Sequence, residues 1–207
     1  MKTNPPSTPA RAGARRRILA AAEELLVREG PQSLSIRGVS ERCGYSAPTI
    51  YHHFGDKEGL TRAVVEVGFA RLLEQLRALG AGDDGSEHLR SLVRTFIEFG
   101  LHNPQYYALF STLHVESSPP PPSVESARAL LEGALLARSR DGGLRQADLD
   151  GVFQAVWALL HGLISLRVRR PHFPWSPRQV EVALEMVEHG LACCRKRREG
   201  PAAEVSS

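Results

Sequence analysis

The 207-residue sequence predicts an all-α protein of about nine helices. Apolar residues recur at helical spacing in every strongly patterned stretch, and no run alternates for long with the two-residue period of a strand. Short segments rich in glycine or proline separate these stretches, as connectors between helices do. The sequence shows no internal repeat, so we expect a globular helical protein rather than a solenoid.

The first predicted helix spans 15–30 and ends at Gly30-Pro31. Two short helices follow within 34–54, and Gly44 stands at the turn because glycine tolerates a positive φ. Ser46 has the position of an N-cap for the second of them. Apolar side chains share the inner face of this pair, while small, polar and aromatic ones share the outer face. Such a pair is typical of a helix-turn-helix that reads DNA.

Six further helices are predicted after the turn, over 56–79, 86–101, 105–115, 124–139, 148–169 and 178–198. The four prolines Pro119–Pro122 predict a stiff extended connector, with a ligand for a proline-binding module as the alternative. The domain organisation that follows is a disordered arm (1–14), a helix-turn-helix domain (15–60), a helical domain (61–199) and a disordered tail (200–207).

The matching residues of a known family lie in this first part of the chain. They are Ile36-Arg37, Val39-Ser40, Cys43-Gly44, Pro48-Thr49-Ile50-Tyr51, His53-Phe54 and Lys57-Glu58-x-Leu60. With these residues the segment resembles the DNA-binding domain of TetR-family transcriptional regulators. Ser40 and Cys43 stand where the family usually has alanine, and both are small enough to fit between packed helices. The resemblance implies a three-helix DNA-binding head followed by a larger helical domain for ligand binding and dimerisation.

The resemblance also implies which residues face double-stranded DNA: Arg37, Ser46, Ala47, Pro48, Thr49, Tyr51, His52 and Lys57. An arginine can donate two hydrogen bonds to a guanine, so Arg37 is the candidate for base readout, and Lys57 has a phosphate position. Residues 1–62 carry ten Lys and Arg against six Asp and Glu, whereas the rest of the chain has a net charge of −1. Positive charge near the predicted reader fits phosphate contact, with a merely solvated surface as the alternative.

Aromatic and histidine side chains gather in the middle helices of the second domain. Apolar walls with a few polar groups suit a small-molecule pocket, although helically spaced aromatics can also be plain core. The candidate ligand-binding residues are Phe96, Phe99, Tyr107, Phe110, His114, Trp157 and His161. Trp157-x-x-x-His161-Gly162 resembles the signature of one TetR subgroup, without indicating the effector.

The last two predicted helices carry more apolar surface than the exterior of a monomer tolerates. Two such helices from each of two chains make a four-helix bundle, which is how TetR proteins usually pair. The sequence therefore predicts a homodimer, with internal core as the alternative. The candidate interface residues are Leu159, Leu163, Leu166, Val180, Leu184, Val187 and Leu191. A dimer would grip two half-sites of an inverted-repeat operator about one helical turn, ~34–36 Å, apart.

No catalytic, cofactor or metal motif is found, so we expect neither an enzyme nor a cofactor. Three cysteines without a disulfide pattern indicate a reduced, cytoplasmic setting, and no stretch is expected to span a membrane. Two alternatives remain: a helical small-molecule binding protein with a vestigial DNA head, and a redox-sensing regulator acting through Cys193 and Cys194, whose neighbouring cations would activate their thiols. The effector, the operator and the regulated genes cannot be deduced from the sequence.

Overall fold

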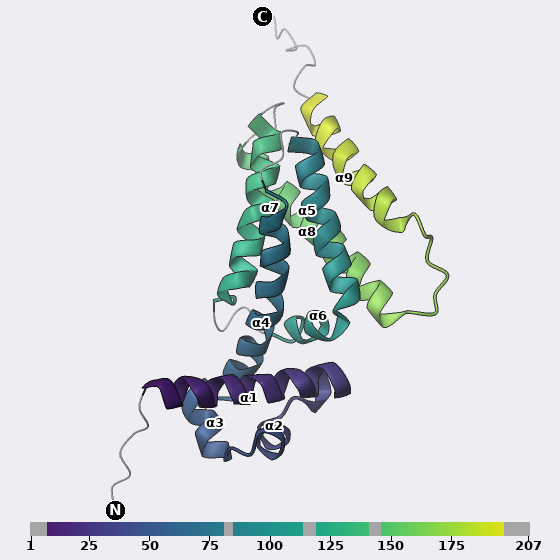
Figure 1. The fold of residues 1–207 in the computed structure, drawn as a ribbon. Coiled ribbons are helices and arrows are strands. Elements are labelled where there is room, and N and C mark those ends of the chain that lie inside the picture. The colour runs from purple at the N-terminus through teal and green to yellow at the C-terminus, as the bar shows by residue number, and fades with distance from the viewer. Residues whose placement is uncertain (1–7, 81–84, 114–118, 141–145, 197–207) are drawn as a thin grey trace, which may run out of the picture. The chain divides into compact units, whose positions relative to one another are not determined.

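A computed structural model describes residues 8–80, 85–113, 119–140 and 146–196 of the chain. At 8–11, 86, 138–140, 146–148 and 192–196 it describes the backbone only. These ranges contain nine α-helices, one short 3-10 helix and no strand (Figure 1). The prediction of an all-α fold with about nine helices is therefore confirmed. The chain divides into two compact units, Met1–Arg71 with Asn103–Glu125 and Leu72–His102 with Ser126–Ser207.

The first unit contains the amino-terminal helices and one short helix from the middle of the chain. Its elements are α1 (Thr8–Glu29), the 3-10 helix η1 (Pro31–Ser33), α2 (Ile36–Cys43), α3 (Ala47–Phe54), most of α4 (Lys57–Ala78) and α6 (Pro104–Phe110). Fully buried aliphatic side chains from α1 to α4 form its core: Ile18, Ala22, Leu26, Val39, Ile50, Leu60 and Val64. Burial of these side chains is the main term that holds the short helices α2 and α3, which would be unstable alone.

The proline connector is fixed to α4 at both of its ends. Arg62 donates a hydrogen bond to the carbonyl oxygen of Pro119. One turn further along α4, the Glu66 carboxylate accepts hydrogen bonds from Ser123 N and Ser123 Oγ at 2.9 and 2.7 Å. Ser123 lies in the first turn of α7 (Pro122–Arg140), where a carboxylate satisfies unpaired backbone N–H groups. Pro119–Pro121 therefore lie in a non-helical segment held on α4, whereas Pro122, expected in the connector, is the first residue of α7.

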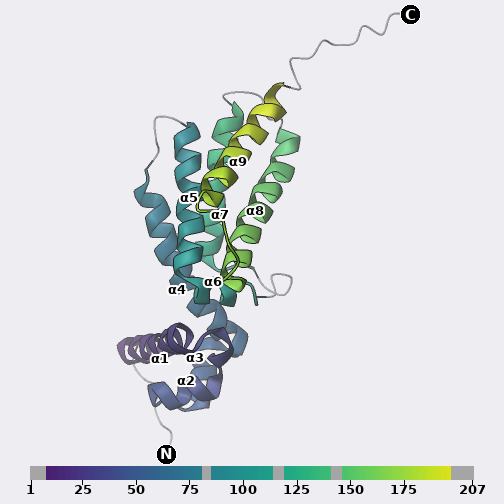
Figure 2. The same ribbon diagram turned by 90° about the vertical axis from the view of Figure 1, so that its right-hand side faces the viewer.

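The second unit is a helix bundle. It contains the end of α4, α5 (Gly85–His102), most of α7, α8 (Gln146–Arg169) and α9 (Gln179–Lys196), which run side by side in both ribbon views (Figures 1 and 2). Helices α5 and α8 approach closely at Gly100, where an added Cβ would lie 2.8 Å from Ile164. Buried residues of the bundle include Leu72, Ile97, Leu135, Leu160, Ile164 and Leu184.

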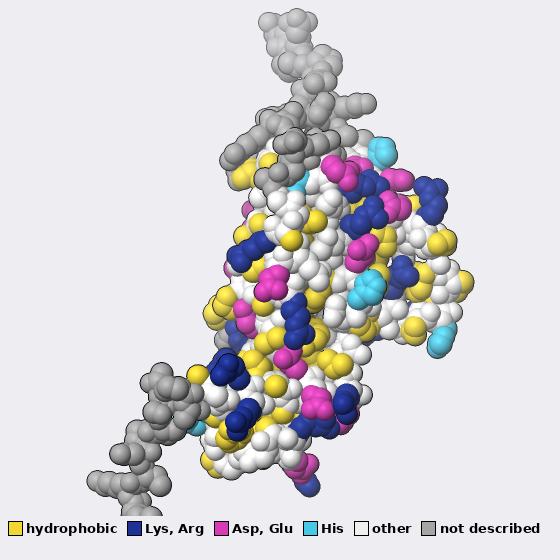
Figure 3. Space-filling view, in the orientation of Figure 1, with side chains coloured by type: hydrophobic (Ala, Val, Ile, Leu, Met, Phe, Trp, Pro, Cys, Tyr) yellow, Lys and Arg dark blue, Asp and Glu magenta, His cyan; other side chains and the backbone are white. Residues whose placement is uncertain are grey.

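Charged side chains join α9 to α5. Arg90 pairs with Glu181 at 2.8 Å and with Glu188 at 2.9 Å, and Arg94 also pairs with Glu181. Hydrogen bonds from Arg94 and then Arg90 lower the pKa of the Glu181 carboxyl. Acidic and basic side chains accordingly gather over these two helices in the space-filling view (Figure 3). This network fixes the side of α9 that faces the bundle.

The structure differs from the sequence-based boundaries at three places. Helix α1 begins at Thr8, within the expected disordered arm, and the arm's residues 1–7 lie outside the described ranges. Helix α6 ends at Phe110, before the expected end at 115. Residues 103–125, expected in the second domain, belong to the same compact unit as the head, and so does α4 up to Arg71.

Candidate functional site

Local capping shapes the helix pair α2 and α3. The hydroxyl of Ser35 accepts a hydrogen bond from Gly38 N at 3.1 Å and thereby caps α2. Gly44 ends α2 with a φ of 72°, the left-handed conformation that an L side chain disfavours. Ser46 occupies the N-cap position of α3, where its carbonyl oxygen accepts from Thr49 N and Ile50 N. Its hydroxyl does not cap the helix but lies 2.9 Å from Thr49 Oγ1.

The outer face of this pair carries the residues that the sequence predicts to contact DNA. Tyr51 is 48% exposed, and the Arg37 side chain is 90% exposed. Ser46, Pro48, His52 and Lys57 are also exposed, while Ala47 and Thr49 are partly so. Ile50, between them in sequence, is fully buried. All eight predicted residues are therefore at least partly accessible to a partner.

Arg37 is not a free cation on this face. Its Nε atom lies 2.8 Å from Glu41 Oε1, one turn further along α2, and this hydrogen bond and charge raise the pKa of Arg37. Such an exposed pair is weak, so the guanidinium can leave it for a better acceptor. Arg42 instead pairs with Glu24 at 2.8 Å and Glu29 at 3.0 Å, which joins α2 to α1.

The basic residues Arg15–Arg17 of α1 are only partly engaged by the protein. Arg15 lies over the ring of Phe54 with its guanidinium carbon 5.2 Å from the ring centre, a cation–π geometry. Arg16 and Arg17 are exposed. Their side chains are therefore accessible to a phosphate backbone that passes the front of this helix.

In the second unit, three of the predicted ligand-binding residues form one aromatic cluster. Phe96 of α5 lies 5.7 Å from Trp157 and 5.8 Å from His161 of α8, and the two α8 rings are 4.1 Å apart. Burial lowers the pKa of His161 to about 4, so the imidazole is neutral at physiological pH. Phe153 extends the cluster, stacked 5.8 Å from Trp157. Sequence reasoning missed Phe153, although it lies one helical turn before Trp157.

The other predicted ligand-binding residues do not join this cluster. Phe99 is buried in the second unit. Tyr107 and Phe110 belong to the first unit, where the rings of Phe110 and Phe69 are 4.8 Å apart. His114 lies outside the described residues.

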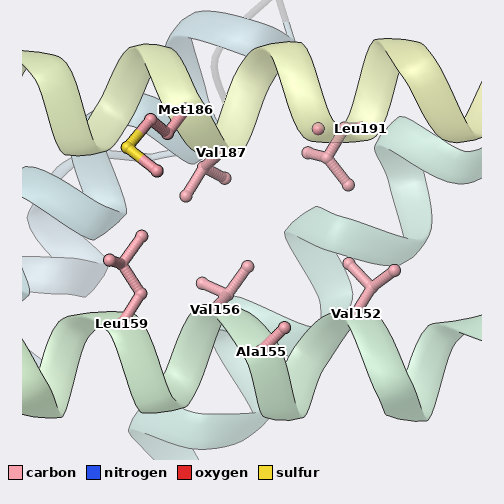
Figure 4. Close-up of a pocket in the computed structure, with 8 residues that line it drawn as sticks. Val152, Ala155, Val156, Leu159, Met186, Val187 and Leu191 are labelled. Atoms are coloured by element: carbon pink, nitrogen blue, oxygen red, sulfur yellow. The ribbon is translucent and has the colours of Figure 1, made fainter.

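Helices α8 and α9 frame a hollow of about 250 Å³ with an almost entirely apolar wall. In Figure 4, side chains of α8 point across the hollow toward side chains of α9. The lining residues are Val152, Ala155, Val156 and Leu159 on α8 and Met186, Val187, Gly190 and Leu191 on α9. Apolar side chains are also exposed on these two helices: Leu166 on α8 is 48% exposed, and Val182 and Met186 on α9 are 43 and 60% exposed.

The seven predicted interface residues divide between this face and the core. Leu159, Val187 and Leu191 line the hollow, Leu166 is exposed and Val180 is half-buried. Leu163 and Leu184 are 5 and 2% exposed, so their side chains belong to the bundle interior and not to the outer face. Met186, which was not among the predicted interface residues, is 60% exposed and therefore far more accessible than Leu163 or Leu184.

Helix α8 contains a stretch that could span a membrane by length and composition, although no such stretch was expected from the sequence. Residues Leu149–Arg169 are long and apolar enough, with a mean hydropathy of 1.4, to cross a membrane by length and composition alone. Only 22% of that stretch is buried within the chain. One helix of this kind is weak evidence for a membrane span, because a helix that serves both a core and a subunit interface has the same composition.

Metal and cysteine chemistry finds little support in the described part of the chain. Among the residues that the structure describes, no group of three or more His, Cys, Asp or Glu side chains is placed to hold a metal ion. Cys43 is half-buried, with its Sγ atom 3.9 Å from the Ser40 carbonyl oxygen. The side chains of Cys193 and Cys194 lie outside the described set.

Two family models match the chain. Residues 18–64 match the bacterial regulatory proteins of the tetR family, and residues 89–191 match the tetracyclin repressor-like C-terminal domain. The chain belongs to the TetR family. The first match contains both helices of the reader, and the second contains the aromatic cluster and most of the α8–α9 face.

Curated relatives within TetR are moderately similar. The HTH-type transcriptional regulator UidR of Escherichia coli is 31% identical over 115 residues, which is 49% of this chain and 59% of that protein. The HTH-type transcriptional activator FasR of Mycolicibacterium smegmatis is 32% identical over 133 residues, 63% of this chain and 61% of that one. The match thus spans about three fifths of the length of each relative.

Solved structures share the TetR fold at lower identity. A structure from Pseudomonas aeruginosa PAO1 superimposes with a TM-score of 0.69 at 22% identity, covering 92% of this chain and 95% of that one. RolR in complex with resorcinol gives 0.68 at 20% identity, covering 97% and 100%. BioQ with its double-stranded DNA operator gives 0.67 at 21% identity, covering 86% and 98%.

Proposed function

We propose that this TetR-family protein is a sequence-specific, DNA-binding transcriptional regulator of the cytoplasm and not an enzyme. The observation that carries the proposal is the exposure of the predicted DNA-contacting residues on α2, α3 and the start of α4. There, Arg37, Tyr51 and Lys57 stand exposed on a buried aliphatic core. The presence of all three residues argues against the alternative of a vestigial head. BioQ, which has the same fold, is known bound to an operator.

The regulator acts as a homodimer paired through α8 and α9. The exposed apolar side chains on these helices and the hollow between them leave a face that water solvates poorly. A second copy supplies an identical face, as a two-fold interface requires. Two heads then bind an inverted repeat, and the tethering of the second head raises the affinity well above that of one.

A small effector binds in the second unit, near the cluster of Phe96, Trp157 and His161. Apolar rings with one neutral imidazole suit a ligand that has an apolar or aromatic body and one polar group. RolR, of the same fold, binds resorcinol. The resemblance of the Trp157-x-x-x-His161-Gly162 run to the signature of one TetR subgroup supports the proposal that the chain belongs to that subgroup.

Effector binding releases the DNA, so the regulator is a repressor in the absence of ligand. Helix α4 begins beside the reader and continues into the second unit, and its shift would change the spacing of the two heads. The ligand must favour one arrangement by differential affinity, because equal affinity shifts nothing. Activation is the second candidate, since the relative FasR is an activator.

Fluorescence anisotropy tests the proposal on DNA from upstream of the protein's own gene. Wild type and the Arg37→Ala/Tyr51→Ala variant are titrated across a salt series against a scrambled duplex. We expect tight, salt-dependent binding that prefers the upstream duplex and is lost in the double variant. Equal, weak binding of both proteins to both duplexes, and to fragments selected from the whole genome, contradicts DNA regulation. Unchanged binding after oxidation excludes the redox alternative at Cys193 and Cys194.

A further inference from the structure

A buried tyrosine joins three helices of the first unit. Tyr106, in the first turns of α6, is 3% exposed. Its ring lies directly on α4 at Gly68, where an added Cβ would come within 2.4 Å of a ring carbon. No side chain larger than hydrogen fits at position 68 while the ring stays in place, so the fit between α4 and α6 depends on this pair.

The tyrosine hydroxyl completes a polar network that reaches α1. It donates a hydrogen bond to Glu23 Oε1 on α1 and accepts one from Arg71 Nη1 on α4 at 3.0 Å. Arg71 Nη2 closes the triangle, 2.8 Å from the same Glu23 oxygen. Burial and the neighbouring carboxylate raise the pKa of Tyr106 to about 12, so the hydroxyl keeps its proton and remains a donor.

The network has room to break and reform. A polar hollow of about 290 Å³ lies beside it, lined by Glu23, Arg71 and Tyr106 together with Glu24, Val27 and Arg28. The Arg71 side chain is 54% exposed and that of Glu23 is 21% exposed. Both charged groups can therefore take up water when the hydroxyl leaves, which lowers the cost of opening compared with a fully buried pair.

The Tyr106 network joins the helix that follows α5 to the helix that packs on the reader. Helix α6 follows α5 after Asn103, so a displacement at the end of α5 acts first on α6. Glu23 follows the buried Ala22 on α1, whose apolar face packs on the reader helices. Based on the proposed function, we propose that Tyr106 is a positioning residue for DNA binding: it latches α6 and α4 to α1 through Gly68, Glu23 and Arg71 and thereby fixes the position of α1 behind the reader helices.

A double-variant cycle tests the latch in the full-length protein. Tyr106→Phe keeps the ring on Gly68 but removes the hydroxyl, and Glu23→Gln removes the charged acceptor. Hydrogen–deuterium exchange of α1 and α6 is measured without DNA, at a temperature where circular dichroism shows all variants folded. We expect each change to speed exchange in both helices about fivefold, the factor for one net hydrogen bond, with no further gain in the double variant.

Glu24→Gln is the matched control, because Glu24 is the neighbouring carboxylate on α1 and pairs with Arg42 instead. Its effect should multiply with that of Tyr106→Phe and leave exchange in α6 unchanged. DNA affinity, measured on the fragment that wild type binds best, should show the same pattern: coupling for Glu23 with Tyr106, independence for Glu24. This pattern is a readout that lost helix stability alone would not produce.

Two results would overturn the latch. One is full multiplication of the Tyr106→Phe and Glu23→Gln effects, and the other is exchange in α1 that Tyr106→Phe leaves at the wild-type rate. Failure of the proposed function looks different, because the exchange experiment contains no DNA. A protein that binds no duplex but shows the coupled exchange has the latch without the regulatory role.

Discussion

Replacing His161 by glutamine should remove an acid-sensitive part of the protein's stability. The imidazole is buried beside Phe96 and Trp157, and burial lowers its pKa from 6.5 to about 4. In the unfolded chain the pKa returns to the ordinary value. As the pH falls below 6.5, His161 therefore binds a proton in the unfolded state but stays neutral in the folded state. The free energy of unfolding accordingly falls until the pH approaches 4.

The two pKa values set the size of this effect. At pH 7.5 His161 is neutral in both states and contributes almost nothing. At pH 5.0 the difference in proton uptake destabilises the fold by about 2 kcal/mol, from the linkage relation. Glutamine keeps a polar group at the site but does not titrate. The variant should therefore lose about 2 kcal/mol less than wild type between these pH values.

Urea unfolding followed by circular dichroism at 222 nm measures this difference. Protein concentration is held constant, because dimerisation would make the midpoint depend on it. His172→Gln is the matched control, since His172 is exposed in the loop between α8 and α9. The His172→Gln variant should lose as much free energy of unfolding as wild type between pH 7.5 and pH 5.0. If His161→Gln and wild type lose equal stability at pH 5.0, the imidazole is not held neutral by burial and the reasoning fails.

Three further substitutions test the fold and its assembly. Gly59→Ala places a Cβ 1.9 Å from the Phe54 carbonyl oxygen at the end of α3, so the free energy of unfolding in urea should fall by roughly 1–3 kcal/mol. As a control, Gly133→Ala on α7 adds a Cβ that meets nothing within 4 Å, and the free energy of unfolding should rise by up to about 1 kcal/mol. Ser35→Ala removes the cap of α2 and should cost about 1 kcal/mol in the same assay, with weaker DNA binding. Met186→Glu puts a charge on the apolar face of α8 and α9 and should convert the proposed dimer to a monomer in sedimentation equilibrium. The control Gln75→Glu, at an exposed position of α4, should leave the dimer intact.

The reader was predictable because its signals are local. Gly44 at the turn, Ser46 at the N-cap position and the apolar inner face with Ile50 follow from short-range rules of capping and periodicity, although the Ser46 hydroxyl bonds Thr49 instead of capping α3. The start of α1 was not predictable in this way. A composition rich in Pro, Thr, Ser and Ala indicated a disordered arm over 1–14, yet proline is tolerated in the first turn of a helix, and the helix begins at Thr8.

Contacts between distant segments were beyond the reach of sequence patterns. The packing of Tyr106 on Gly68, and its bond to Glu23, joins residues that are 38 and 83 positions apart. No periodicity encodes such contacts, so α6 was assigned to the second domain. The burial of Leu163 and Leu184 inside the bundle could not be predicted for another reason. Helices α8 and α9 are apolar on more than one side, and periodicity alone cannot tell which side faces the core.

Selection of bound duplexes from a random-sequence pool tests the central claim most directly. A dimer that presents two α2–α3 readers should enrich an inverted repeat whose half-sites lie about one helical turn, or a multiple of it, apart. Arg37→Ala should relax the preference at one base pair in each half-site, symmetrically. An enriched motif without two-fold symmetry, or no enrichment above the starting pool, would contradict the account of a dimeric DNA-reading regulator.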